Sequence, residues 1–156
     1  SAEQGYGPAE WNVGTAHENG FAVEKSLEKA AHFFANAANK GVPSAKYDIG
    51  RLYMQGTGVK RNVKTAVRWI REAAKENDPR AQTHFAYLYG AGKGLPFSPR
   101  KCYIWATIAA TNGNEQADEL REECASFMDS DEITDAQKSA KWEREAITKR
   151  DVVIRE

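Results

Sequence analysis

The middle of the chain, residues 45–74, reads AKYDIGRLYMQGTGVKRNVKTAVRWIREAA. The same pattern returns 36 residues earlier and 36 residues later without a gap. The repeated columns include Ala9, Ala45 and Ala81; Gly20, Gly56 and Gly92; Phe33, Trp69 and Trp105; and the pairs Ala37–Ala38, Ala73–Ala74 and Ala109–Ala110. So many positions in register indicate an internal repeat, and a fixed period of about 20 to 50 residues is typical of solenoids.

Each repeat contains a helix with a defined start and end. The predicted N-caps, whose side chains accept from free backbone N–H groups, are Ser26, Asn62 and Ser98. The predicted terminators, which tolerate a left-handed backbone, are Gly41, Asn77 and Gly113. Between the second pair, an apolar face at helical spacing is formed by Ala66, Trp69, Ile70, Ala73 and Ala74.

A second helix precedes the capped one and runs from about Ser44 to Gln55 in the middle repeat. Its inner stripe is Ala45, Ile49, Leu52 and Tyr53. Gly50 falls in mid-helix, where glycine costs roughly 1 kcal/mol relative to alanine. We expect a neighbouring helix to approach closely at this glycine. The repeating unit is therefore a helix hairpin, which buries its apolar faces only when hairpins stack.

These patterns predict an all-α fold, a right-handed α-solenoid, as a single repeat domain over residues 1–156. The predicted parts are repeats 9–44, 45–80 and 81–116, a half-repeat 114–128, and a polar C-terminal capping helix 134–150. Thr134 and Gln137 have the spacing of a capping box, which places the start of the last helix at Thr134.

The composition is that of a folded chain, with 41% hydrophobic and 28% charged residues among 156. Lys plus Arg and Asp plus Glu each number 22, so the formal net charge is zero, which disfavours nucleic-acid binding. No apolar run is long enough to insert into a membrane. The chain begins at Ser1 rather than at methionine, which predicts a mature form whose signal peptide has been removed.

Sequence motifs for catalysis, metal binding or cofactor binding are missing. The histidines His17, His32 and His84 lack the i, i+4 spacing of a helical metal site. Residues 90–94, GAGKG, lack the Gly-Lys-Ser/Thr ending of a phosphate loop, and the repeat itself explains Gly92. The carboxylates are scattered, as on a solvated surface. We therefore predict no catalytic residue, no metal site and no cofactor.

Two motifs together identify a family. The first is Ala45-x-x-x-Ile49-Gly50-x-x-Tyr53-x-x-Gly56-x-Gly58-Val59, and the second is Ala66-x-x-Trp69-x-x-x-Ala73-Ala74. They closely resemble the Sel1-like repeat, a relative of the tetratricopeptide repeat, from about Ala9 to Ala117. Departures are local: His17 replaces a tyrosine, Ala86 a glycine, and Asn62 an aspartate. The resemblance to bacterial members implies a protein that binds other proteins.

By analogy with the tetratricopeptide arrangement, the first helix of each repeat lines a concave surface. The residues that this analogy places on the partner-binding surface are Trp11, Thr15, Tyr47, Arg51, Met54, Gln55, Tyr87, Glu119 and Glu123. Exposed Trp, Tyr, Arg and Met are enriched at protein interfaces. The alternative is that Trp11 and Tyr47 only fill gaps between helices.

Three functions remain open. The first is a non-enzymatic interaction module, whose most concrete version is an immunity protein that blocks a secreted toxic effector such as a phospholipase or another hydrolase. The second is a scaffold or regulatory adaptor for envelope assembly, secretion or signalling. The third is a hydrolase of cell-wall-related substrates, which would need a side chain with a strongly shifted pKa in a cleft. The partner's identity and the oligomeric state do not follow from the sequence.

Cys102 and Cys124 lie at equal sequence distances on either side of the turn at Gly113, so they should lie at the same height on two antiparallel helices. Both occupy inward columns of the repeat. They form either a disulfide or two buried free thiols, because spacing fixes height but not rotation. A disulfide would predict a periplasmic or extracellular location, and free thiols would leave a cytoplasmic one.

Overall fold

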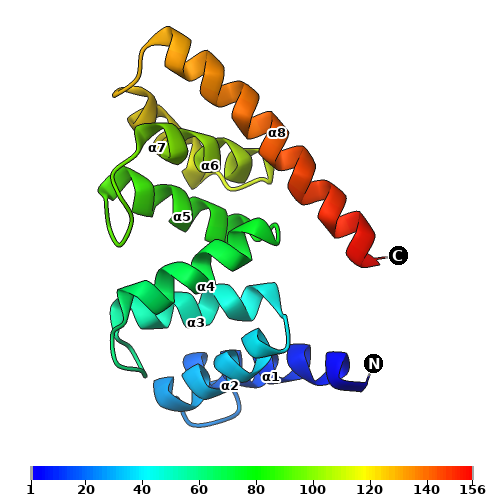
Figure 1. Cartoon of the computed structure of the whole chain (residues 1–156). Coiled ribbons are helices and arrows are strands. Elements are labelled where there is room, and N and C mark those ends of the chain that lie inside the picture. The colour runs from blue at the N-terminus through cyan, green and yellow to red at the C-terminus, as the bar shows by residue number, and fades with distance from the viewer. Residues whose placement is uncertain (1, 156) are drawn as a thin grey trace. The chain divides into compact units, whose positions relative to one another are not determined.

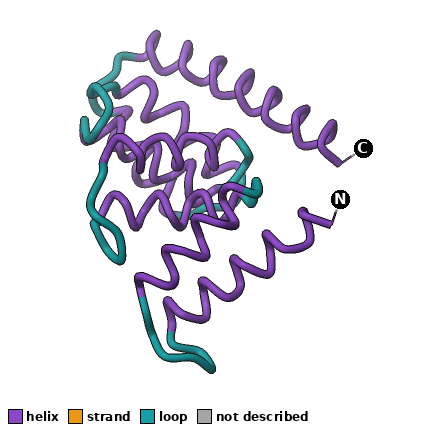
Figure 2. Tube along the Cα trace, turned by 60° about the horizontal axis from the view of Figure 1, so that its bottom comes forward, coloured by secondary structure: helices purple, strands orange, loops and turns teal. Residues whose placement is uncertain are grey.

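The computed structural model describes the backbone of residues 2–155 and the side chains of residues 6–150. The described elements are α1 (Ala2–Asn19), α2 (Leu27–Asn39), α3 (Pro43–Gln55), α4 (Val63–Lys75), α5 (Pro79–Ala91), α6 (Pro99–Thr111), α7 (Gln116–Ala125) and α8 (Ser130–Arg155). Within this range every regular element is a helix, joined by loops (Figures 1 and 2). The all-α, repeat-based fold expected from the sequence is confirmed.

The predicted helix boundaries are set by the expected caps. The side chains of Ser26 and Ser98 accept from backbone N–H groups three residues on, each at 3.2 Å, and Asn62 does so at 3.0 Å. At the other ends, Asn77 adopts a φ of +70°, in the left-handed region that stops a helix. These local interactions define one hairpin after another along the chain.

The loops that connect the two helices of each hairpin share one backbone design. In all three, the N–H of the N-cap residue donates back to a carbonyl near the end of the first helix. These bonds are Ser26 to His17, Asn62 to Tyr53 and Ser98 to Tyr89, at 2.9, 3.0 and 3.0 Å. The three loops therefore repeat their backbone hydrogen bonding although their side chains differ.

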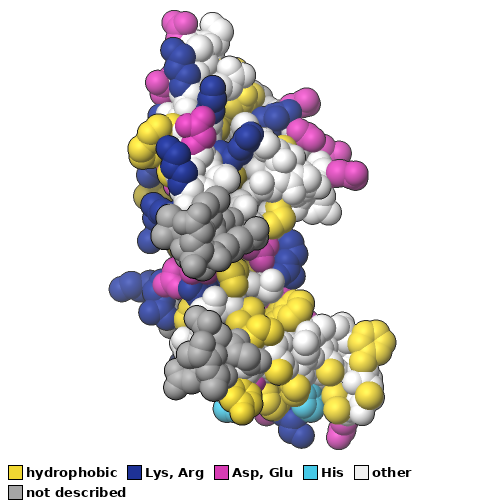
Figure 3. Space-filling view, turned by 90° about the vertical axis from the view of Figure 1, so that its right-hand side faces the viewer, with side chains coloured by type: hydrophobic (Ala, Val, Ile, Leu, Met, Phe, Trp, Pro, Cys, Tyr) yellow, Lys and Arg dark blue, Asp and Glu magenta, His cyan; other side chains and the backbone are white. Residues whose placement is uncertain are grey.

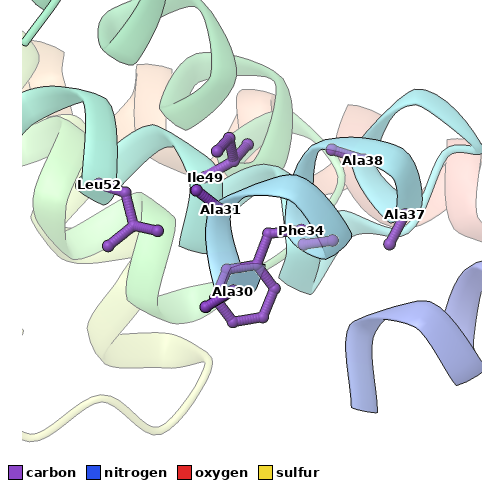
Figure 4. Packing of buried hydrophobic residues seen from close by; sticks show 8 residues of the cluster. Ala30, Ala31, Phe34, Ala37, Ala38, Ile49 and Leu52 are labelled. Carbon is purple, nitrogen blue, oxygen red and sulfur yellow. The ribbon is translucent and has the colours of Figure 1, made fainter. Parts of the chain in front are cut away.

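The chain divides into two compact units, Ser1–Ala73 and Ala74–Glu156. In the N-terminal unit a core cluster joins α2 to α3 (Figure 4). Its buried members are Ala30, Ala31, Phe34, Ala37, Ala38, Ala45, Ile49 and Leu52. Most of them are alanines, which lets the two helices come close. On the face shown in Figure 3, further hydrophobic side chains gather on this unit.

The mid-helix glycines face large side chains of the second helix. A Cβ placed on Gly14 would lie 2.7 Å from Phe34, and one on Gly50 would lie 2.9 Å from Ile70. The close approach expected at Gly50 is therefore confirmed. In the third repeat the same two columns hold Ala86 and Ala106, both fully buried. Where the first helix has alanine instead of glycine, the matching position of the second helix thus has alanine instead of Phe or Ile.

In the C-terminal unit, α6 is the central element, since α5, α7 and α8 all pack against it. α8 contributes the buried side chains Ala136, Ala140 and Ile147. Where α5 begins and α6 ends, three amides form a network. Asn112 Nδ2 donates to Asn77 Oδ1 at 2.7 Å and to Gln82 Oε1 at 2.8 Å, while Gln82 Nε2 donates to the carbonyl of Ala74 at 3.0 Å. The fully buried Gln82 amide is therefore satisfied.

The last helix begins four residues before the start that we predicted. Asp129 Oδ1 accepts from the N–H of Glu132 at 2.8 Å, and Glu132 Oε2 accepts from the N–H of Asp129 at 3.0 Å. This reciprocal pair is the actual capping box. Thr134 lies one turn inside the helix and donates to the carbonyl of Ser130. The half-repeat helix is also shorter than residues 114–128, because α7 spans only Gln116–Ala125.

We predict that Gly50→Ala destabilises the protein by about 1 to 3 kcal/mol, despite alanine's better helix propensity. The added methyl would meet Ile70 Cγ1 at 2.9 Å and Trp69 Cβ at 3.2 Å. The double variant Gly50→Ala/Ile70→Ala should lose less stability than the sum of the losses of the two single variants. Alanine at position 70 removes the contact with the added methyl, as the alanines at positions 86 and 106 do in the next repeat. Denaturant unfolding of both single variants and the double variant measures this coupling, and strict additivity would contradict it.

Candidate functional site

The predicted partner-binding residues of the N-terminal unit include a hydrogen-bonded cluster between α1 and α3. Trp11 Nε1 donates to Asp48 Oδ2 at 2.7 Å, and Arg51 Nε donates to Asp48 Oδ1 at 3.2 Å. Arg51 Nη2 also forms an ion pair with Glu18 Oε1. Asp48 is only 4% exposed, so this network supplies donors to a buried carboxylate.

The cluster gives Trp11 and Arg51 a structural role. Burial alone would lower the pKa of Arg51, but the hydrogen bond that Arg51 donates to Glu18 and the charge of Asp48 outweigh it and raise that pKa above its ordinary value. The Trp11 ring is half-buried and packs against the core cluster of α2 and α3. Both side chains therefore already have partners within the unit, as the gap-filling alternative for Trp11 requires, and their role in partner binding stays a prediction.

The other predicted residues of this unit line up along the same two helices. Thr15 donates to the carbonyl of Trp11 at 3.0 Å, and Tyr47 is half-buried on α3. Met54 is half-buried and Gln55 is exposed at the end of α3. The carbonyl of Met54 accepts from Arg61 Nε at 3.2 Å. The described contacts of these residues are thus within the unit and leave Gln55 the most accessible.

The C-terminal unit contains a pocket of about 110 Å³ among α5, α6 and α7. Its lining residues are Tyr87, Gly90, Ala91, Phe97, Pro99, Leu120, Glu123, Cys124 and Phe127. Two of the predicted site residues, Tyr87 and Glu123, line it. The third, Glu119, lies one helical turn before Glu123 on α7 and is exposed. The structure thus places Tyr87 and Glu123 at one apolar pocket, with Glu119 beside Glu123 on α7.

Three exposed aromatic side chains form the rim of this pocket, which we call the aromatic pocket. Tyr87, Phe97 and Phe127 are 44%, 54% and 68% exposed. Phe97 and Phe127 meet edge to face, with ring centroids 5.6 Å apart. The ammonium group of Lys93 lies 5.5 Å from the centroid of Tyr87. Exposed aromatic groups of this kind indicate a binding surface rather than a core.

Phe97 and Phe127 were missed in the sequence analysis, although a signal was present. Residues one to three periods away in each column are polar, positively charged or small. The columns are Tyr87 with Thr15 and Arg51, Phe97 with Lys25 and Arg61, and Phe127 with Asn19, Gln55 and Ala91. The repeat fold therefore does not require an aromatic residue at these three positions.

A disulfide joins Cys102 on α6 to Cys124 on α7, with Cα atoms 6.0 Å apart. Cys124 forms part of the pocket wall. A Cβ built on Gly90 would lie 3.0 Å from the sulfur of Cys102 and 3.7 Å from that of Cys124. The disulfide therefore packs directly against α5 at Gly90 and holds α7, with Glu123, against the rest of the pocket.

The charges around the pocket are unevenly paired. Glu119, Glu122 and Glu123 on α7 have no ion-pair partner among the described side chains, whereas Asp118 pairs with Arg121 at 2.9 Å. Arg100, next to Pro99, is held by Asp135 at 3.1 Å. Burial, reinforced by the charge of Lys93, lowers the pKa of His84 and so favours its neutral form.

Two features of other site classes are not seen in the described part of the chain. No three His, Cys, Asp or Glu side chains of residues 6–150 are grouped as metal ligands would be. No described helix is both long and apolar enough to span a bilayer.

Comparison with known proteins places the chain in a family. The model of the Sel1 repeat matches residues 7–42, 43–78 and 79–114, and the chain belongs to this family. Proteins with such repeats commonly mediate protein–protein interaction, and the fold is an interaction scaffold rather than a known enzyme class. No curated protein sequence matches the chain.

Solved structures support the same assignment. A Sel1 repeat protein from Oxalobacter formigenes is 29% identical with a TM-score of 0.72, over 81% of this chain and 51% of that one. The protein c5321, described as a protective antigen of uropathogenic Escherichia coli with an SLR fold, is 27% identical with a TM-score of 0.81, over 92% and 31%. The chain thus spans about half and about a third of these two proteins. Cysteine-rich protein B of Helicobacter pylori, at 22% identity over 60% of this chain and 70% of that one, shares the fold with a TM-score of 0.56.

We predict that Arg51→Ala destabilises the protein by roughly 2 kcal/mol, because it removes a charged donor from the buried Asp48 and from Glu18. Thermal unfolding followed by circular dichroism measures this effect. Arg144→Ala, which removes an exposed arginine of α8, is the matched control. If the two variants melt at the same temperature, the cluster does not stabilise the fold.

We predict that denatured protein shows two reactive thiols only after reduction. The disulfide closes a loop of 22 residues, so reducing it should lower stability by about 3 kcal/mol. The measurement is a melt with and without reductant, with the Cys102→Ala/Cys124→Ala variant as the control that reductant leaves unchanged. Two thiols titrating without reductant, in protein isolated from an oxidising compartment, would rule out the bridge.

Proposed function

We propose that this chain is a non-enzymatic binding module for a partner protein, and that the aromatic pocket is its principal contact site. The observation that supports this most is that Tyr87, Phe97 and Phe127 are exposed aromatic residues at positions where the other repeats have none. Aromatic side chains are enriched at the cores of protein interfaces, where a few residues contribute most of the binding energy. Membership of a family of interaction scaffolds supports the same function.

The size of the pocket favours a protein over a small cofactor. Ligand sites for small molecules commonly have volumes of about 300 to 1,000 Å³. The aromatic pocket, at about 110 Å³, has room for one side chain rather than for a whole cofactor. A side chain of a partner protein, packed in the pocket against Phe97 and Phe127, is an occupant of suitable size.

The disulfide supports a location outside the cytosol, in the periplasm or beyond the cell, since disulfides persist in oxidising compartments. In that location the more specific form of our proposal is an immunity protein that neutralises a secreted hydrolase or phospholipase. A scaffold for envelope assembly or secretion is the alternative role. The two roles differ in their effect on the partner, because an immunity protein inhibits it and a scaffold does not.

We expect Phe97→Ala/Phe127→Ala to weaken partner binding at least ten-fold while leaving the melting temperature unchanged, because both rings are exposed. The measurement is quantitative capture from the source organism, followed by titration of the captured protein. Trp142→Ala is the control, since Trp142 is an exposed aromatic side chain of α8, 69% exposed, and does not line the pocket. Equal binding by the double variant would exclude the pocket as the contact site.

The specific role is tested on the captured partner itself. Stoichiometric loss of its hydrolytic activity on adding this chain supports immunity. A partner whose activity is unchanged, or which has none, supports the scaffold.

A further inference from the structure

We propose that the aromatic pocket recognises a partner segment with one bulky apolar side chain next to lysine or arginine residues. The apolar side chain enters the pocket beside the Phe97–Phe127 pair, and the basic residues face α7. This inference rests on the proposed function and adds the chemistry of the partner.

The apolar half of this specificity comes from the pocket lining. Phe97 and Phe127 supply ring edges and faces, and Leu120 supplies an aliphatic wall. Gly90 and Cys124 also line the pocket, and the Cys102–Cys124 disulfide packs against Gly90, where an added Cβ would lie 3.0 Å from the sulfur of Cys102. A bulky side chain that fills this hollow removes apolar surface from water, which favours binding.

The charged half comes from α7. Glu123 lines the pocket, and Glu119 lies four residues before it, so their carboxylates are neighbours on the same side of the helix. Like charges at this spacing on a helix repel each other. Neither carboxylate has an ion-pair partner among the described side chains. A cation brought by the partner would relieve this repulsion.

The other charged groups nearby define on which side the basic residues lie. Lys93 lies over Tyr87 on the α5 side of the pocket, 3.4 Å from its hydroxyl. Arg100 is engaged by Asp135, and burial favours the neutral form of His84. The α7 side is therefore acidic and the α5 side carries one lysine. Basic residues of the partner are attracted to the α7 side only.

Four fluorescein-labelled peptides in one Gly/Ser frame test the inference by fluorescence anisotropy with the oxidised chain. Their centre is Leu or Ala, and the flanking residues are Lys or Glu. We expect the Leu peptide with Lys flanks to bind at least ten-fold more tightly than the other three. Phe97→Ala/Phe127→Ala should abolish that binding.

Charge reversal provides the decisive comparison. Glu119→Lys/Glu123→Lys should shift the preference to the Leu peptide with Glu flanks and keep the requirement for Leu. Glu24→Lys/Glu145→Lys makes the same change in net charge at exposed positions that do not line the pocket, and should keep the Lys preference.

Each outcome bears on one claim. Equal binding of the Lys and Glu peptides, or an unchanged preference after charge reversal, overturns the charge assignment. Binding of none of the peptides overturns recognition of such a segment, while the proposed function stands if the captured partner still requires Phe97 and Phe127. Loss of that last requirement overturns the proposed function itself.

Discussion

The whole fold depends on how closely the two helices of each hairpin approach each other. That distance is set where a very small residue of the first helix meets the second helix: Gly14 at Phe34 and Gly50 at Ile70. In the third hairpin the matching positions hold Ala86 and Ala106, both buried. The first helix of each hairpin thus keeps a very small residue at this position, and the connecting loops keep the same backbone hydrogen bonds.

The two units use polar groups in contrasting ways. Beside the core of the N-terminal unit, Trp11 and Arg51 donate hydrogen bonds to the buried carboxylate of Asp48. These donors therefore stabilise the fold. In the C-terminal unit, the aromatic pocket exposes rings to water, and carboxylates without ion-pair partners stand beside it. Exposed rings beside unpaired charges contribute little to the fold, which is why this unit offers the better candidate for a binding site.

The fold could be predicted from the sequence because its determinants are local and recur. Caps such as Ser26 and Ser98, and the alanine columns, can be recognised within a few residues and are confirmed by their repetition. The start of α8 could not be decided in this way, since Asp129–Glu132 and Thr134–Gln137 both have the spacing of a capping box. Only the reciprocal hydrogen bonds of Asp129 and Glu132 distinguish the two.

The candidate site was less predictable because it depends on contacts between distant segments. Tyr87, Glu119 and Glu123 were identified from their columns. The pairing of Trp11 with Asp48 across 37 residues, however, depends on side-chain rotamers that spacing does not specify. Phe97 and Phe127 meet across a loop and the end of a helix. The available signal was departure from the repeat, because Phe97 and Phe127 are aromatic where the other residues of their columns are not.

The third connecting loop has a consequence for how such a protein changes over time. Gly92 and Ser98 supply the backbone conformation and the cap that the hairpin needs, and Ser98 repeats the backbone bond of the other loops. Residues 95–97 between them read LPF, where the earlier loops have VEK and VKR. The exposed side chains of this loop thus differ from those of the earlier loops, while its backbone hydrogen bond is the same. A lineage of such proteins can acquire new partners by drift at a few loop positions, with little risk to folding at each step.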